Sequence, residues 1–501
     1  MINRKKLRSL PDLLNKRLLL IFGNPPLGIA EIENSGIPIS PGIRNLLNRD
    51  AYVTHATQPG LGAVSLATYM NRAGYKAVVK DWYLDSVPIE EFQIIGISTT
   101  ALDLNNLADI TKKIRIKNPD CLLIGGGPLS WSYSPEEIFT EIQEIDFFVN
   151  NEGEITFIDL LVALEKGYDL TGVSGISFRM GDSVHTTPTR TALNPKNISL
   201  PDWSLVDFNN RIPLLPFETM RGCPYQCAFC SEVTYWGKPV RFRAVSDILS
   251  EVEHDIERFG ITTFRISDSC FSAPENRCLE VCSGLTERFI NNGVKIQWSA
   301  FSRITNLQPF LIEKMKGAGC VALDIGMESG DTAILKGMKK NYESKDIIER
   351  VTMVHEAGII AHCNVVVGFP GETRTSIQNT IDTLNASRPD TYHCMLLYVA
   401  PNTDLSIHRN HYSLVGDKLH WNHATMSSDQ ASEAMNEIVQ SVKNSCLFIS
   451  GEISSIMLIA SGFTQNDVRS FFSNIADNKI GDAERAMSEK ALLRKVLPVR
   501  E

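Results

Sequence analysis

The sequence lacks the features that would place a chain in a membrane, on nucleic acid or outside the cell. No apolar run approaches the roughly 18 residues that a membrane span needs. The formal net charge is −9, whereas a nucleic-acid partner would leave a basic footprint. Residues 4–8 form a basic start, but the apolar run at 18–22 is too short for a signal peptide. We therefore predict a cytoplasmic protein with no membrane and no nucleic-acid partner.

The cysteines lack the pattern of a disulfide framework, which favours a reducing compartment. Three of the eleven nevertheless stand close together, because Cys223, Cys227 and Cys230 are spaced C-x3-C-x2-C. Random placement would give this spacing only about 0.005 times per chain. Three neighbouring thiolates can ligate three irons of a [4Fe–4S] cluster and leave the fourth iron open. The alternatives are three buried core cysteines or a zinc knuckle, which needs a fourth Cys or His, and none follows before His254.

This stretch resembles the cluster-binding loop of the radical SAM superfamily. The match includes the lead-in Arg221-Gly222-Cys223-Pro224 and the aromatic Phe229 just before the last cysteine. The resemblance implies that the three cysteines hold a [4Fe–4S] cluster, that its open iron chelates S-adenosylmethionine (SAM), and that Phe229 lies in the cofactor site. In that family one electron splits SAM into methionine and a 5′-deoxyadenosyl radical. An external donor such as flavodoxin or ferredoxin is then implied as a partner.

The first third of the chain alternates short apolar runs with amphipathic segments, which predicts parallel strands joined by helices. The expected strands are residues 18–22, 77–80, 94–98, 122–124 and 147–149. A helix over 62–73 is expected to end at Gly74, and Ser134 begins a capping box with Pro135 at the first helical position. We predict a Rossmann-like, doubly wound α/β domain over residues 1–165. Its ligand crevice would lie outside the carboxyl ends of the strands.

Small residues follow two of these strands and would let a large ligand approach the backbone closely. One strand runs into Ser98-Thr99-Thr100 and the next into Gly125-Gly126-Gly127. On fold alone they could equally be tight turns. The region resembles the cobalamin-binding domain that precedes many radical SAM domains, with Ser98-x-Thr100, Gly125-Gly126 and the later Glu152-Gly153-Glu154 in matching places. The resemblance implies a cobalamin site that contains Ser98, Thr99, Thr100, Gly125, Gly126, Gly127 and Glu152.

One part of that family pattern is missing. The slot before the first helix reads Thr57-Gln58-Pro59-Gly60-Leu61-Gly62, with Pro59 where the family carries its cobalt-ligating histidine. The nearest histidine, His55, is out of register. If cobalamin binds, we expect its lower face not to be ligated by a histidine of this motif.

Residues 166–215 are rich in Thr, Pro, Asn and Ser, so we predict a connector with a weak strand at 175–180 and a domain boundary near Leu200. Strand and helix patterns then alternate again. The expected strands are 217–220, 263–267, 295–301, 321–326, 360–367 and 392–398, and the expected helices 245–258, 275–291, 309–318, 345–357 and 375–386. Six such units predict a partial (βα)6 TIM-type barrel over 216–400, with its site at the carboxyl ends of the strands.

Polar groups stand at four of those strand ends. They are Ser267-Asp268, Ser302-Arg303, the Gly326–Gly330 stretch with Glu328, and residues 368–373. Each has an ordinary alternative: Asp268 could cap a helix, Arg303 could form a surface ion pair, and 368–373 could be a turn and helix start. The stretches also resemble radical SAM counterparts, which implies that Ser267, Asp268, Ser302, Arg303 and Glu328 contact SAM.

We predict a mainly helical region over 401–501. Its helix is indicated by the spacing of Ala431, Met435, Ile438, Val442 and Cys446. The histidines His408, His411, His420 and His423 are spaced too irregularly for a metal site. They either line a substrate pocket or lie on the polar surface of a capping domain.

The resemblance implies a radical SAM enzyme that uses a [4Fe–4S] cluster, SAM and cobalamin on a small-molecule or natural-product substrate. The leading hypothesis is methylation of an unactivated carbon, in which the deoxyadenosyl radical abstracts hydrogen and the carbon radical takes methyl from methylcobalamin. Ring contraction, cyclisation or oxidation with the same cofactors is an alternative. A non-catalytic corrinoid or iron–sulfur binding protein is an alternative of another class. No catalytic residue is assigned beyond the cluster cysteines.

Overall fold

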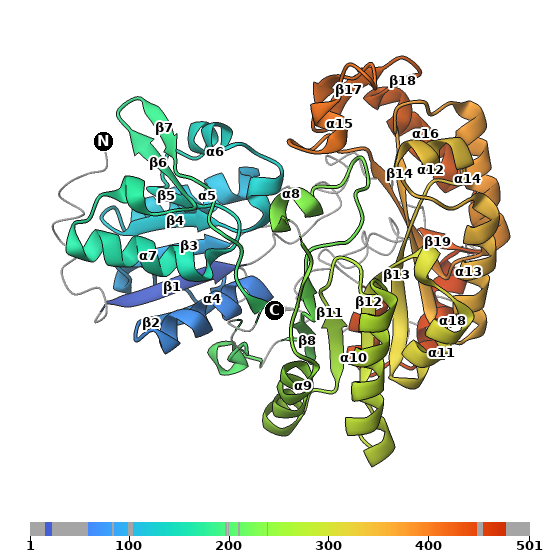
Figure 1. Ribbon diagram of the computed structural model, residues 1–501, viewed down its shortest axis with the longest axis horizontal. Helices are drawn as coiled ribbons and strands as arrows, with labels where there is room; N and C mark the ends of the chain where they lie inside the picture. The colour runs from blue at the N-terminus through green and yellow to red at the C-terminus, as the bar shows by residue number, and fades with distance from the viewer. Residues whose placement is uncertain are drawn as a thin grey trace. The chain divides into compact units, whose positions relative to one another are not determined.

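The computed structural model describes residues 16–22, 59–82, 85–98, 104–195, 198, 200–208, 211–237, 239–447 and 454–476. The candidate residues Thr99 and Thr100 lie outside them, as do Thr57 and Gln58 of the first slot and the nearby His55. The described residues form two compact units, one of 16–22, 59–208 and 234–241, the other of 211–233 and 242–476 (Figure 1). None of the helices described is long and apolar enough to cross a membrane.

The first unit is built on a seven-stranded sheet in the order β2-β1-β3-β4-β5-β6-β7. Its strands are β1 (Arg17–Phe22), β2 (Lys76–Asp81), β3 (Ile94–Ser98), β4 (Leu122–Gly126), β5 (Phe147–Val149), β6 (Ile176–Met180) and β7 (Ser183–Thr186). The first five are parallel, and β6 and β7 are antiparallel additions at one edge. All five strands predicted for this domain are therefore present.

Helices cover both faces of this sheet because its parallel strands are apolar on both sides. The helices are α4 (Leu61–Arg72), α5 (Leu104–Lys117), α6 (Pro135–Glu141) and α7 (Gly153–Lys166). Figure 1 shows α4 and α7 on one face and α5 and α6 on the other. Leu19 and Ile21 of β1 point into the core shared with α5 and α6. The predicted capping box begins α6, where Ser134 Oγ accepts from the Glu137 backbone N–H at 3.2 Å.

The strand order creates one reversal of direction. From β1 the chain crosses to β2 on one side, and β3 then lies on the other side of β1. In such sheets ligands bind outside the carboxyl ends of the strands at this switch point. The predicted small-residue edge lies next to it, because Ser98 at the end of β3 is paired with Gly126 at the end of β4.

The segment predicted as a connector contributes two strands to this sheet. The weak strand signal at 175–180 is β6, and the chain then turns at Gly181 and Asp182 into β7. Gly181 has a φ of +64°, as tight hairpin turns require. A Gly-Asp pair between two short runs is a hairpin signal, but β7 is polar and therefore resembles a loop in sequence.

The second unit has a seven-stranded parallel sheet in the order β19-β15-β14-β13-β12-β11-β8. Its strands are β8 (Leu214–Phe217), β11 (Thr263–Ile266), β12 (Gln297–Arg303), β13 (Cys320–Glu328), β14 (Ile360–Val367), β15 (Thr391–Leu396) and β19 (Cys446–Leu447). The helices that follow them are α9 (Val245–Phe259), α10 (Glu275–Arg288), α11 (Pro309–Gly317), α12 (Thr332–Gly337), α13 (Ser344–Glu356) and α14 (Arg374–Ser387). Six βα units form the partial barrel as predicted, but the first strand lies at Leu214–Phe217 and not at 217–220, and β19 extends the sheet.

The remaining elements lie around the cysteine loop and after the barrel. They are β9 (Met220–Arg221), α8 (Glu232–Trp236), β10 (Arg241–Phe242), α15 (Asp404–Ile407), β16 (Val415–Asp417), β17 (His420–His423), β18 (Met426–Ser427), α16 (Ser428–Ser441), α17 (Ser455–Ala460) and α18 (Gln465–Ala476). Residues of α17 and α18 share a buried core with Leu214, Val321 and Ile360, so these two helices pack near the amino ends of the strands.

The helix predicted from Ala431 to Cys446 is shorter than expected. The element α16 ends at Ser441, Val442 is extended, and Asn444 has a φ of +61°. This reversal brings Cys446 into β19 beside β15, so its apolar side chain is buried by sheet pairing and not by a helix face. The region also holds the antiparallel sheet β16-β17-β18, which the prediction of mainly helical structure did not include.

We expect alanine substitution to destabilise the fold at one of two adjacent glycines of β4 and to have little effect at the other. A Cβ at Gly125 would lie 2.9 Å from Cδ2 of the fully buried Phe148, whereas a Cβ at Gly126 would make only ordinary contacts with Val149, at 3.5 Å from its carbonyl oxygen and 3.6 Å from its Cβ. Gly125→Ala should lower the free energy of unfolding by about 1–3 kcal/mol through overpacking. Gly126→Ala should change it by about 0.5 kcal/mol or less. Urea denaturation followed by far-UV circular dichroism tests this, and equal midpoints for the two variants would contradict it.

Candidate functional site

The cysteine loop begins where β8 ends, and a buried carboxylate holds its start. Asp268 Oδ1 accepts hydrogen bonds from the backbone N–H groups of Thr219 at 2.6 Å and Met220 at 3.2 Å, and the Thr219 hydroxyl donates to Oδ2. Burial raises the pKa of Asp268 to about 6, although the hydrogen bonds from Thr219 and Met220 lower it. Both carboxylate oxygens are therefore engaged by the loop. Asp268 therefore anchors the backbone at the start of the cysteine loop.

Backbone contacts hold the middle of the loop. Gly222, just before the first cysteine, has a φ of +96°. The Ala228 N–H donates to the Met338 carbonyl at 3.2 Å, and the Ala228 carbonyl accepts from the Leu405 N–H at 2.9 Å. The segment that carries the three cysteines is thus fastened to the chain that follows α12 and to the start of α15.

The cysteine thiols of the loop lie close enough to influence one another. Burial raises the pKa of Cys223 and of Cys230, and the nearby Cys227 and Glu232 raise both further. Among the residues described, no group of three or more Cys, His, Asp or Glu side chains is arranged to hold a single metal ion. A [4Fe–4S] cluster differs from such an ion because it offers each thiolate its own iron.

Arg303 at the end of β12 reaches this loop from the neighbouring part of the sheet. It is only 4% exposed, and its Nη1 donates to Cys227 Sγ at 3.2 Å. Its second arm, Nη2, donates to the Lys339 carbonyl at 3.2 Å. The guanidinium carbon lies 4.2 Å from the ring centroid of Tyr225 and 5.5 Å from that of Tyr342. Cation and thiol are therefore brought together from positions 76 residues apart.

A buried ion pair stands at the end of the next strand, β13. Glu328 Oε1 accepts from Lys340 Nζ at 2.7 Å, and both side chains are buried. Glu328 has a φ of +65°, an unusual backbone conformation for a residue that is not glycine. Lys340 Nζ lies 5.5 Å from the ring centroid of Phe229 in the cysteine loop. Charged groups of both signs thus lie beside the cysteines.

Sequence reasoning missed Lys340 and Tyr342. The Tyr342 hydroxyl donates to the Gly326 carbonyl at 2.7 Å, which stabilises the end of β13 where Glu328 stands. The only signal was a run of polar and aromatic residues, Lys339-Lys340-Asn341-Tyr342, after an amphipathic helix. Such a run is ordinary in loops, and nothing local to it indicates a partner.

The other predicted SAM residues have different surroundings. Ser302 is buried, and its hydroxyl donates to Ser272 Oγ at 2.8 Å. Ser267 is exposed, and its backbone N–H donates to the Phe217 carbonyl at 2.8 Å. In residues 368–373, Thr373 caps α14, and the buried Glu372 accepts from the Gly368 N–H. This last stretch therefore has the turn and helix-start structure that was its ordinary alternative.

The four histidines of the C-terminal region do not converge. His423 is buried, stacks on Trp421 with ring centroids 5.3 Å apart, and its Nε2 lies 3.1 Å from the Gly368 carbonyl. The other three, His408, His411 and His420, are exposed. Their exposure favours the polar-surface alternative for these three residues.

The glycine-rich edge of the first unit is open at the backbone. Gly127 has a φ of +93°, and Gly126 has room for a Cβ. Glu152 is already paired, because both its oxygens accept from Arg241 Nη1, at 2.8 and 2.9 Å. Its Oε2 also accepts from the Leu193 N–H at 2.8 Å, at the wall of a cavity of about 230 Å³. The structure thus gives Glu152 a role in holding its own unit together.

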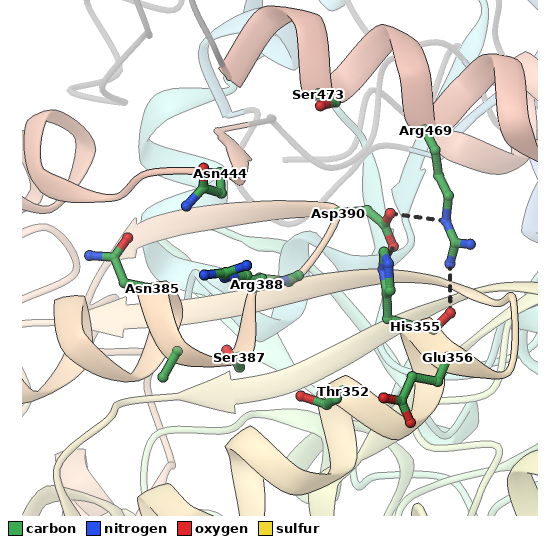
Figure 2. A pocket seen from close by; sticks show the side chains of 12 residues that line it. Thr352, His355, Glu356, Asn385, Ser387, Arg388, Asp390, Asn444, Arg469 and Ser473 are labelled. Carbon is green, nitrogen blue, oxygen red and sulfur yellow. Dashed lines mark hydrogen bonds and ion pairs between the residues drawn. The ribbon is translucent and has the colours of Figure 1, made fainter.

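A pocket of about 550 Å³ is lined by residues of α13, α14 and α18, and the three cysteines are not among its lining residues (Figure 2). At its wall Asp390 accepts from Arg469 Nε at 3.0 Å and from the Ala361 N–H at 2.9 Å. Asp390 immediately precedes β15 and Ala361 is in β14, so the pocket is at the amino ends of these strands. In barrels of this kind that end contributes stability and the opposite end carries the chemistry.

Comparisons with known proteins identify relatives. Residues 217–384 match the Radical SAM superfamily. An uncharacterized methyltransferase of Pyrococcus horikoshii is 28% identical over 66% of this chain and 73% of its own length. The anaerobic magnesium-protoporphyrin IX monomethyl ester cyclase of Rubrivivax gelatinosus is 22% identical over 71% of this chain and 66% of its own. The cobalamin-dependent radical SAM methyltransferase TokK of Streptomyces tokunonensis is 26% identical over 64% of this chain and 48% of its own length.

Among solved structures, the radical SAM methyltransferase TsrM of Kitasatospora setae, with cobalamin and a [4Fe–4S] cluster bound, has a TM-score of 0.67. It is 15% identical, and the match covers 94% of this chain and 100% of that one. This likeness concerns the fold, and it confirms the predicted fold class of a Rossmann-like unit followed by a partial TIM-type barrel. Residues 217–384 therefore form a radical SAM domain, and the chain is similar to proteins that include cobalamin-dependent radical SAM methyltransferases.

Proposed function

We propose that this protein is a cobalamin-dependent radical SAM enzyme that methylates an unactivated carbon of a small molecule. The observation that carries the proposal is the gathering of three cysteines, a buried arginine and a buried Glu–Lys pair at the carboxyl ends of the barrel strands. TIM-type barrels carry their active sites at the carboxyl ends of the strands. Methyltransferases among the relatives support the reaction type.

We assign Cys223, Cys227 and Cys230 as ligands of a [4Fe–4S] cluster. The surroundings suit that group, because Arg303 is buried beside Cys227 and its Nε has no hydrogen-bond partner among the described residues. A buried cation needs an anionic partner, and a ligating cysteine is a thiolate. When bound, the cluster supplies one electron that splits SAM into methionine and a 5′-deoxyadenosyl radical, and the corrinoid supplies the methyl group. The electron would come from a flavodoxin or ferredoxin.

The chain's own residues would bind and orient SAM at this rim. Glu328 is suited to the ammonium or ribose hydroxyls of SAM, and Lys340 to its carboxylate. Phe229 offers an apolar face beside Lys340. Glu328 and Lys340 are buried, so their charges interact more strongly than they would in solution. Arg303, Ser302 and Asp268 would support this surface through their hydrogen bonds with Cys227, Ser272 and Thr219, respectively.

For the corrinoid, the carboxyl edge of β3 and β4 is the proposed site. Ser98 and Gly126 are paired there, and Gly127, which follows, has a φ of +93°. Side chains this small leave the backbone accessible to a large ligand. Because Pro59 stands in the histidine slot, we propose that no histidine of this motif ligates cobalt.

Cyclisation with the same cofactors is the second candidate. It is favoured by the relatives named anaerobic magnesium-protoporphyrin IX monomethyl ester cyclase. Both reactions begin with hydrogen abstraction by the deoxyadenosyl radical, so the residues around the cysteines do not distinguish them. The fate of the SAM methyl group does.

We expect Cys223→Ala, Cys227→Ala and Cys230→Ala each to lower iron content and 5′-deoxyadenosine formation by more than about a hundredfold. Substitution of residues that only hydrogen-bond to metal ligands already lowers metal affinity roughly 10- to 100-fold, so loss of a ligand should cost more. Iron assay and product chromatography after anaerobic reconstitution measure this. The matched control is Cys320→Ala, a buried cysteine of β13, which should keep wild-type iron content. A requirement for Cys270 or Cys320 would refute the assignment.

We expect Gly126→Val to prevent corrinoid binding while the protein still folds. The corrinoid must approach the backbone closely at this position, and the valine side chain would occupy that space. The amount of corrinoid that the protein retains should therefore fall at least about tenfold. Absorption spectra after reconstitution with hydroxocobalamin and desalting measure the retained amount. Gly172→Val is the control, because nothing lies within 4 Å of a Cβ there. The bound Co(II) corrinoid should also show no EPR splitting from a histidine nitrogen, and such splitting would argue against the site.

If the reaction is methylation, steady turnover should produce 5′-deoxyadenosine and S-adenosylhomocysteine in a ratio of about one to one. The reason is that the cluster and the corrinoid would each consume one SAM per turnover. One SAM yields the radical, and the other gives up its methyl group. Methyl-deuterated SAM should label the product, which mass spectrometry detects. Substrate consumed with deoxyadenosine alone, and with no label in the product, would reject methyl transfer in favour of cyclisation.

A further inference from the structure

We infer that Arg303 is a positioning residue that compensates the negative charge of the cysteine loop at Cys227 and thereby raises the reduction potential of the cluster. The inference rests on the proposed function, because it takes Cys227 as a cluster ligand. It concerns a property of the cluster that can be measured without a substrate.

The guanidinium is held in place on its edges and its faces. One arm donates to Cys227 Sγ at 3.2 Å and the other to the Lys339 carbonyl at 3.2 Å. Tyr225 stacks at 4.2 Å, and its hydroxyl is fastened to Asn306 Oδ1 at 2.5 Å. A planar fork fixed in this way keeps one N–H directed at the sulfur. The hydrogen bond to a thiolate is charge-assisted and therefore stronger than a neutral one.

Arg303 differs from the other buried arginines described by having no carboxylate partner. Arg221 pairs with Glu218 at 2.9 Å, Arg243 with Glu251 at 2.5 Å, and Arg277 with Glu280 at 3.4 Å. None of the described carboxylates pairs with Arg303, and its Nε has no hydrogen-bond partner. An uncompensated buried charge strongly destabilises a fold. The anion that Arg303 requires is therefore the Cys227 thiolate.

The second cation near the loop does not share this property. Lys340 is neutralised by Glu328 at 2.7 Å, so this pair adds little net charge at the cysteines. Arg303 is the cation that no described carboxylate neutralises, so its charge acts on the cysteine loop itself. Reduction transfers one electron from an external one-electron donor to the cluster and makes its net charge more negative by one. A fixed guanidinium in a buried site stabilises that added charge, and hydrogen bonds to the cysteine sulfurs tune cluster potentials.

The test is a potentiometric titration of the full-length protein, reconstituted anaerobically with iron and sulfide and followed by the EPR signal of the reduced cluster. Arg303→Gln removes the charge and keeps an amide N–H, whereas Arg303→Lys keeps the charge and loses the fork. We expect Arg303→Gln to lower the equilibrium constant for reduction of the cluster about tenfold, which is a fall of about 59 mV in the reduction potential of a one-electron couple. Arg303→Lys should keep a reduction potential near that of the wild type. Arg265→Gln is the control, because that arginine pairs with Asp324 at 3.4 Å.

The outcomes separate the inference from the proposed function. A wild-type potential in Arg303→Gln, with full iron loading, would overturn the role of Arg303 and leave the function untouched. Iron loading lost in Arg303→Gln and retained in Arg303→Lys would support charge compensation at Cys227. Loading lost in both folded variants would assign Arg303 a purely geometric role and overturn the electrostatic one. A wild-type protein that assembles no cluster would instead reject the proposed function.

Discussion

In a sheet of parallel strands all the carboxyl ends lie at one edge, and the candidate site depends on this constraint. The cysteine loop follows β8, Arg303 ends β12 and Glu328 ends β13. Between them the chain runs through helices and back across the barrel, yet each strand returns to the same edge. The helices need no specific feature for this, since any right-handed βα unit has that consequence. The position of the chemistry is therefore a property of the sheet.

Charge compensation then decides what the edge can hold. Each buried cation at the cysteine loop lies against a specific partner, Glu328 for Lys340 and Cys227 for Arg303. These contacts lie in a water-poor environment, where an unpaired charge would be costly. The same pairing that stabilises the fold thus leaves anionic and cationic groups beside the three thiols. An amino-acid-like ligand such as SAM carries both signs and suits such a surface.

Several motif residues serve the scaffold in this structure. Asp268 holds the backbone of Thr219 and Met220, and Glu152 joins Arg241 to Leu193. Thr373 caps α14. A motif match marks such residues without saying which of their atoms remain available. The hydrogen-bond partners are needed to separate a residue that supports a site from one that can contact a ligand.

The sequence by itself determined the local features. Alternation of apolar residues predicted five strands of the first unit and six of the second, and Ser134 to Glu137 predicted the start of α6. The cysteine spacing predicted the loop because its three members are within eight residues of one another. These signals work because their partners are near in sequence. Only the tertiary structure decided that Arg303 meets Cys227, that Lys340 neutralises Glu328, and that Cys446 joins a sheet instead of a helix. Such contacts join residues brought together by chain packing, and no periodicity along the sequence encodes which distant side chain will be the partner.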